Sequence, residues 1–197
     1  MDVLCSDKTG TLTSGEMILS DHIDPFGKSS KRVFWFAYLN SFHETGIKGT
    51  ANKAILGQEN INPLDLAILL HDHPDVHTYK KIDELPFDFE RKRVSVIVGN
   101  RSKRLLITKG APENIFSICE SLEDKGKLRE IDQETLSLVN QTFNQLSEKG
   151  FRILAVAFRT LPVQDKYKLN DESKLTFAGF WFLRIRFFLK FLILLKI

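Results

Sequence analysis

Asp7 begins a heptapeptide whose residue types suit phosphoryl-transfer chemistry, Asp-Lys-Thr-Gly-Thr-Leu-Thr at residues 7–13. It follows an apolar run at residues 3–5, which predicts a short strand that ends at the carboxylate. In α/β folds such strand ends lie at the carboxyl edge of a parallel sheet, where ligands bind. There Asp7 can attack a phosphoryl group, while backbone amides hold its oxygens and Lys8 offsets their charge. An ordinary turn is the alternative for the first four residues, because Asp and Gly favour turns.

Lys109 and Gly110 form a second group with ligand-binding chemistry, since they follow a predicted strand at residues 105–108. A ligand can approach a glycine closely, and the lysine places a cation beside a phosphate. The alternative is a helix start, with Pro112 at the first helical position and Glu113 in the first turn. Both descriptions can hold together, and we expect Lys109 to contact the ligand.

Three other side chains are candidates for the same ligand. Phe87 precedes a basic run at residues 91–93, which suits stacking of a base and attraction of phosphates, although a core ring and a solvated charge run are the alternative. Arg152 lies between a helix end and a buried strand, where it can bind phosphates or form a salt bridge. Asp65 can accept a hydrogen bond from a ligand or orient a neighbour, while Asn62 can cap the helix that follows it.

Apolar periodicity and breaker residues predict strands and helices in alternation around these side chains. The longest helix is expected at residues 132–149, where one face carries Leu136, Val139, Phe143 and Leu146, and Gly150 ends it. Further helices are predicted at residues 31–42, 51–56, 63–71 and 112–120. Strands are predicted at residues 79–89, 93–98, 105–108, 151–159 and 175–180, and the second and third form an antiparallel hairpin.

The heptapeptide and the six residues before it resemble the phosphorylation signature of the P-type ATPases, and within them the bacterial magnesium-transporting branch. Later segments resemble elements of the same pumps independently. They are Asn-Pro-Leu-Asp at residues 62–65, Phe-Asp-Phe-Glu-Arg-Lys-Arg-Val-Ser-Val at 87–96, Lys-Gly-Ala at 109–111 and Gly-Phe-Arg-Ile-Leu-Ala at 150–155. Asn-Ser-Phe-His at residues 40–43 resembles a stretch typical of the magnesium branch, and no role for His43 follows from it.

The resemblance implies a role for each candidate side chain in an ATP pocket. Phe87 would stack on the adenine, whereas Phe89, which stands where other pumps often carry a polar residue, would be a core residue. Asp65 would accept a hydrogen bond from the adenine amino group, and Arg152 would contact the phosphates. Lys109 and Gly110 would line the same pocket.

The resemblance also implies the fold class and the domains. The fold would be α/β: an α+β nucleotide-binding domain, with an antiparallel sheet flanked by helices, inserted in a Rossmann-like phosphorylation domain of haloacid-dehalogenase type. Residues 1–22 would begin the phosphorylation domain, and residues 23–173 would form the nucleotide-binding domain. Residues 174–180 would be the return strand, and residues 181–197 a divergent apolar-basic tail.

Thr9 bears on the reaction that the resemblance implies. In these pumps Asp7 would attack the γ-phosphate of Mg-ATP and form an aspartyl phosphate, with Lys8 and Thr9 beside it and Mg²⁺ held in part by Asp7 and Thr9. Phosphatases of the same fold carry a general acid-base aspartate two residues after the nucleophile. Thr9 cannot do that work at neutral pH, so a pump with a persistent phosphoenzyme is favoured over a soluble phosphatase.

Cysteine and histidine usage favours no metal site. Cys5 and Cys119 have no metal-type spacing and no secretory signal precedes them, which suits a reducing compartment and buried structural roles. Three histidines lie at residues 71–77, but Pro74 and the loop context argue against a fixed ligand geometry.

Composition and hydropathy limit the partners. The net charge of +3 is too small to indicate nucleic acid. Residues 1–174 contain no apolar run of the roughly 20 residues that a membrane helix needs. We therefore expect the cytoplasmic portion of a bacterial inner-membrane protein, with ATP as ligand and without the membrane and actuator domains. The transported cation, Mg²⁺ by resemblance, would concern only the intact pump.

The C-terminal segment leaves two interpretations open. Arg184, Arg186 and Lys190 interrupt the apolar run of residues 181–197, so a spanning helix is not expected. A basic amphipathic surface anchor is one interpretation, and a frameshifted, out-of-frame segment is the other and the one we favour. For the chain as a whole, a stand-alone nucleotide-binding or regulatory module without catalysis is the alternative to a pump portion.

We expect the 197-residue chain to bind ATP weakly and to form no stable phosphoenzyme. The family strings Thr-Gly-Asp and Gly-Asp-Gly-x-Asn-Asp, which supply magnesium and phosphate contacts, are missing from its sequence, as is the actuator string Thr-Gly-Glu. Incubation with γ-labelled ATP and Mg²⁺, followed by an acid quench, measures this directly. Label that survives the quench on the wild type, but not on Asp7→Asn, would show the expectation to be wrong.

Overall fold

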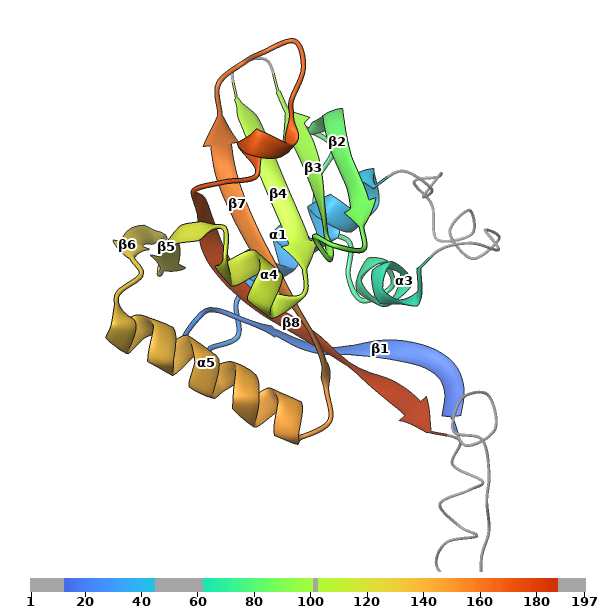
Figure 1. Cartoon of the computed structure of the whole chain (residues 1–197). Coiled ribbons are helices and arrows are strands. Elements are labelled where there is room, and N and C mark those ends of the chain that lie inside the picture. The colour runs from blue at the N-terminus through green and yellow to red at the C-terminus, as the bar shows by residue number, and fades with distance from the viewer. Residues whose placement is uncertain (1–12, 45–61, 101–102, 188–197) are drawn as a thin grey trace, which may run out of the picture.

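The structure is a computed structural model that describes residues 13–44, 62–100 and 103–187 (Figure 1). Within these ranges one sheet contains the strands β1 (Thr13–Ile23), β2 (Lys80–Asp88), β3 (Arg93–Gly99), β4 (Arg104–Gly110), β5 (Cys119–Asp124), β6 (Lys127–Glu130), β7 (Arg152–Leu161) and β8 (Leu175–Phe187). Their order is β2-β3-β4-β7-β8-β5-β6, and β1 also pairs with β8. Neighbouring strands are antiparallel, apart from the parallel pair β5 and β8.

Helices cover both faces of this sheet. They are α1 (Lys31–His43), α3 (Pro63–Leu69), α4 (Pro112–Phe116) and α5 (Gln133–Glu148), and a 3₁₀ turn, η1, spans Leu169–Asp171. α1 and α3 pack on one face, while α4 and α5 lie against the other (Figure 1). This mostly antiparallel sheet flanked by helices confirms the predicted α+β architecture.

The central strands separate two hydrophobic cores because successive side chains of a strand point to opposite faces. In β3, Val96 and Val98 pack with α1 and α3, whereas Ile97 packs with α4 and α5. In β4, Ile107 belongs to the first core and Leu106 to the second. Apolar side chains on both faces explain why these strands read as nearly continuous apolar runs in the sequence.

Polar residues begin the helices by accepting hydrogen bonds from backbone amides that have no partner inside the helix. Asn62 Oδ1 accepts from the amide of Leu64 at 3.1 Å, so the predicted cap of α3 is confirmed. Asp132 Oδ1 accepts from the amide of Thr135 at 2.7 Å at the start of α5. Gly150, with φ of +76°, ends that helix as predicted.

The largest differences between predicted and observed bounds concern α4 and β8. The helix predicted at residues 112–120 is too long, because α4 ends at Phe116 and β5 begins at Cys119. Cys119 pairs with Leu175 of β8, and this long-range strand pairing overrides the local helical pattern. The hairpin of β5 and β6 was not predicted, and β8 continues beyond the predicted end at residue 180.

β1 and β8, the first and last described strands, lie side by side as a long antiparallel ribbon (Figure 1). The predicted boundaries at residues 22–23, 173–174 and 180–181 stay predictions, as does insertion into a phosphorylation domain. The heptapeptide apart from Thr13, the helix predicted at residues 51–56 and the tail from residue 188 lie outside the described residues. No helix in the described ranges is long and apolar enough to cross a membrane.

Cys119 is held as a structural thiol. Its Sγ donates to the carbonyl of Ile115 at 3.1 Å, and burial raises the pKa of the thiol to about 12. Because the thiolate is the reactive form, Cys119 is an inert thiol at neutral pH. Cys5 lies outside the described residues.

Gly179 and Gly126 give a matched test of backbone packing. A Cβ at Gly179, where φ is +146°, would lie 2.0 Å from the carbonyl oxygen of Ile23, whereas no described atom lies within 4 Å of one at Gly126, where φ is +82°. Gly126→Ala should cost about 1 kcal/mol of unfolding free energy for its left-handed backbone. Gly179→Ala should cost about 3 kcal/mol or more, because strand β1 must also move. Urea denaturation measures both, and equal losses would contradict the assigned packing.

Candidate functional site

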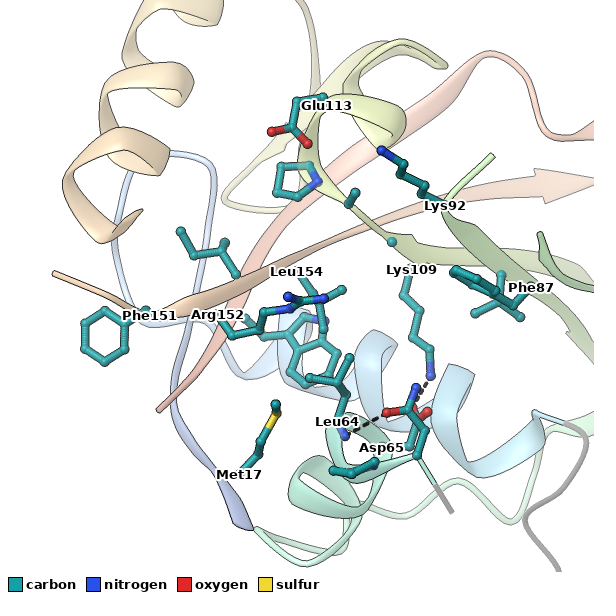
Figure 2. Close-up of a pocket in the computed structure, with 18 of the residues that line it drawn as sticks. Met17, Leu64, Asp65, Phe87, Lys92, Lys109, Glu113, Phe151, Arg152 and Leu154 are labelled. Atoms are coloured by element: carbon teal, nitrogen blue, oxygen red, sulfur yellow. Dashed lines mark hydrogen bonds and ion pairs between the residues drawn. The ribbon is translucent and has the colours of Figure 1, made fainter. Parts of the chain in front are cut away.

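A cavity of about 940 Å³ lies where α3, the β2–β3 turn, the β4–α4 junction and the start of β7 meet (Figure 2). Its volume falls within the range of about 300–1,000 Å³ that is usual for small-molecule sites. Met17 of β1 and Trp181 of β8 also line it, so strands from both ends of the described chain contribute.

Lys109 is buried beside this cavity in a cluster of polar side chains from three elements. Its Nζ forms ion pairs with Asp65 and, at 2.7 Å, with Glu44 Oε2. It also donates to Ser41 Oγ at 3.1 Å, and Ser41 donates to Asp65 Oδ1 at 2.5 Å. Figure 2 shows the Lys109 side chain extending from β4 toward Asp65 at the start of α3. The charge of Lys109 is therefore already compensated inside the protein.

Burial and charge act in opposite directions on this cluster. Burial alone lowers the pKa of Lys109, but Asp65 and Glu44 outweigh it and raise that pKa above its ordinary value of 10.5. For Glu44, burial raises the pKa above its usual range and Asp65 adds to the increase, although Lys109 opposes both. Lys109 thus stays protonated at neutral pH.

Phe87 and Phe89 form an aromatic rim at the cavity mouth. Their rings are T-shaped with centroids 5.3 Å apart, and the residues are 51% and 87% exposed. The prediction that Phe89 is a core residue is therefore wrong. Asp88 makes the intervening turn by accepting from the amides of Glu90 and Arg91, at 3.0 and 2.8 Å, and this turn directs both rings outward.

Lys92 and Arg152 line the cavity, and the positive charge of neither side chain is compensated by a nearby carboxylate among the described residues. Across the described residues, no carboxylate lies within 4.0 Å of either side chain. Arg152 begins β7 and Figure 2 shows its side chain beside Leu154, while Lys92 approaches from the β2–β3 turn. The two cations and the aromatic rim give the cavity groups that suit a planar ring and an anion.

Gly110 has a packing role in the structure. A Cβ there would lie 2.5 Å from the carbonyl oxygen of Lys92, and that carbonyl accepts from the amide of Ala111 at 3.0 Å. The missing side chain thus lets the β2–β3 turn contact the end of β4. Glu113 also lines the cavity, at the far end from Asp65 (Figure 2).

Five residues predicted from the sequence to bind a ligand line this cavity together: Asp65, Phe87, Lys109, Gly110 and Arg152. Their contacts with a ligand stay predictions, as do the roles of Asp7, Lys8 and Thr9, which lie outside the described residues. The sequence reasoning missed Lys92, Phe89 and Glu44 as lining residues. Lys92 could have been found from its place in the basic run, but Glu44 follows a helix and carries no local signal.

Arg91 and Arg93, the other residues of the basic run, do not line the cavity. Both bind Glu172, so only the middle residue of the run faces the ligand space. Among the described residues there is also no group of three His, Cys, Asp or Glu side chains arranged to hold a metal ion.

Aromatic rings and cations that line one cavity of a mixed α/β fold are typical of small-molecule-binding domains. Residues 70–181 match the family model of the P-type ATPase cytoplasmic domain N. The chain therefore belongs to the P-type ATPases, as its motifs predicted.

Relatives within this family agree with the predicted branch. Over 183 residues the chain is 38% identical to a magnesium-transporting ATPase, P-type 1, of Escherichia coli K12, covering 91% of this chain and 19% of that protein. It is 26% identical over 190 residues to a calcium-transporting ATPase of Listeria monocytogenes, covering 90% and 22%. The chain spans about a fifth of the length of the curated relatives that it matches.

Replacing Lys109 tests the buried cluster. Lys109→Met leaves Asp65 and Glu44 without their cation, so the free energy of unfolding should fall by about 3 to 5 kcal/mol. In the wild type the contribution of Lys109 is present below pH 10.5 and lost as the pH rises through its raised pKa. Urea denaturation measures the loss, with the exposed Lys127→Met as control.

The same pair of proteins gives a pH dependence. In Lys109→Met the burial that raises the pKa of Glu44 is no longer opposed by a cation, so the destabilising effect develops as the pH rises and the carboxylate ionises. The difference from the wild type should thus be smaller at about pH 5 than at about pH 7.5. A difference that does not change with pH would contradict the assignment of both carboxylates to this lysine.

Proposed function

We propose that the cavity binds ATP and that the chain contributes the nucleotide-binding part of a cation-transporting P-type ATPase. The observation that carries the proposal is the arrangement of an exposed aromatic rim and two uncompensated cations around one cavity of about 940 Å³. Aromatic rings bind a purine base by stacking, and cations bind the phosphates.

The positions of the side chains suggest how ATP would lie. The adenine would stack on Phe87, with the ring of Phe89 at its edge. Asp65 Oδ1 already accepts from Ser41 and Lys109, which leaves Oδ2 to accept from the adenine amino group. The phosphates would then extend toward Lys92 and Arg152, the cations that have no carboxylate partner among the described residues. Lys109 would act mainly by holding Asp65 in place.

The transport function that we propose for the whole pump is inferred from the relatives. The name of the E. coli relative states magnesium transport, and that of the L. monocytogenes relative states calcium transport. We infer a divalent cation as the cargo of the whole pump and favour Mg²⁺ because of the higher identity to the magnesium transporter. The nucleotide pocket would face the cytoplasm, which the description of the matching family model as a cytoplasmic domain supports.

Asp7 is the proposed phosphate acceptor of the pump. Lys8 and Thr9 would assist it, and Mg²⁺ would accompany ATP and be held in part by Asp7 and Thr9. Bound Mg²⁺ reduces the repulsion between a carboxylate nucleophile and phosphate oxygens. Asp7, Lys8 and Thr9 lie outside the described ranges.

Base and phosphate contacts can be separated by comparing ATP with adenosine. Phe87→Ala should weaken the binding of both ligands by about tenfold, because loss of base stacking costs roughly 1–3 kcal/mol. Arg152→Ala should weaken ATP by about tenfold and leave adenosine nearly unchanged, because a charge-assisted hydrogen bond contributes about 1.5–3 kcal/mol. Isothermal titration measures both dissociation constants.

Arg129→Ala serves as the control, since Arg129 lies exposed on β6 and does not line the cavity. It should bind both ligands like the wild type. No binding of ATP by the wild type, or equal effects of Phe87→Ala and Arg129→Ala, would contradict the proposed site.

A further inference from the structure

Glu172 is a buried carboxylate that the nucleotide pocket does not touch. Its side chain is fully buried and it follows η1, before β8 begins. Its two oxygens accept from Arg91 Nη1 at 2.8 and 2.6 Å and from Arg93 Nε at 3.0 Å. Glu172 Oε1 also accepts from Ser95 Oγ at 2.7 Å. A buried carboxylate with this many partners is fixed in one geometry.

The donors of Glu172 all come from one short segment, the end of the β2–β3 turn and the start of β3. Arg91 extends the contact to the other side of the turn, since its Nη2 donates to the carbonyl of Pro86 at 2.6 Å. Pro86 directly precedes Phe87, and Arg91 and Arg93 flank Lys92. Glu172 therefore holds both ends of the segment that carries the aromatic rim and the cation Lys92.

The turn itself needs this support. Lys92 has φ of +48°, a left-handed conformation that is unfavourable for a residue with a side chain. Its amide donates to the carbonyl of Asp88 at 2.7 Å, and its carbonyl accepts from the amide of Ala111. With Arg91 and Arg93 both bound to Glu172, the Lys92 side chain is left on the cavity side, where it lines the cavity.

We propose that Glu172 is a positioning residue of the nucleotide pocket, which fixes the segment of residues 86–93 so that Phe87, Phe89 and Lys92 face the ligand. This role rests on the proposed function, because it assumes that the cavity binds ATP. Glu172 acts from 77–81 positions away in the sequence. It also lies three residues before β8, so it connects the nucleotide segment to the strand that pairs with β1.

Glu172→Gln tests the role, because it keeps the size of the side chain and removes the charge that binds two arginines. It should weaken ATP binding by about tenfold, as is typical when a residue that orients a binding group is lost. Adenosine should weaken as well, since Phe87 would also be displaced. Glu172→Asp keeps the charge and should recover part of the affinity. Isothermal titration at a temperature where circular dichroism shows each variant folded gives these values.

Two controls separate positioning from general destabilisation. Glu123→Gln removes another largely buried carboxylate, which pairs with Arg32 Nε at 2.6 Å away from the cavity, and it should change ATP affinity by less than about twofold. In the double variant Phe87→Ala/Glu172→Gln the two losses of adenosine affinity should not add fully, because both act on the base through the ring of Phe87. Additive losses would overturn the proposal.

Arg91→Lys covers the case in which Glu172→Gln does not fold. It keeps a cation for Glu172 but loses the second donor to Pro86, so ATP should weaken by about threefold. In hydrogen exchange, the amide of Lys92 should exchange faster in this variant than in the wild type. Wild-type affinity and wild-type exchange in Arg91→Lys would overturn the role of Glu172 while leaving the proposed function intact. Absence of ATP binding by the wild type would overturn the proposed function, and this role with it.

Discussion

The antiparallel register of β3 and β4 is the constraint on which the rest of the site depends. Val94 lies opposite Lys109, and Ser95 lies opposite Thr108. Because side chains alternate along each strand, Lys109 shares the face of α1 and α3, whereas Ser95 and Thr108 point to the other face. Ser95 Oγ and Thr108 Oγ1 are 2.6 Å apart there. A shift of the register by one residue would exchange the two faces and separate both polar clusters from their partners.

Each face of the sheet buries one charged side chain between two side chains of opposite charge, and the sign differs between the faces. On one face a buried cation, Lys109, lies between Asp65 and Glu44, and on the other a buried anion, Glu172, lies between Arg91 and Arg93. Burial of an unpaired charge is costly, so each of these charges requires its partners. The charge of Lys109 is compensated by its two carboxylate partners, so this lysine adds no uncompensated positive charge to the cavity. An anionic ligand would therefore depend on Lys92 and Arg152 for its attraction, and not on the lysine that the motif makes most conspicuous.

Local signals in the sequence were sufficient for much of the fold. Asn62 and Gly150 mark helix ends through hydrogen bonding and backbone conformation that are properties of the residues themselves. The helix expected after Pro112 was too long because pairing of Cys119 with β8 depends on residues more than 50 positions away. Phe89 was misassigned for a related reason. The family resemblance predicts a core position for it, but the turn at Asp88 places this ring in solvent.

Site residues could be predicted only where a single motif contained the residue and also indicated its role. Phe87, Lys109 and Arg152 stand in recognisable strings, whereas Glu44 and Glu172 act through partners that no local pattern connects to them. The basic run shows why residue type matters at neighbouring positions. Arginine presents several donors in a fixed plane, which suits the shared carboxylate of Glu172, whereas lysine is a compact charge on a flexible stem. Arginines at 91 and 93 therefore fix the turn, and the lysine between them places a flexible cation at the cavity.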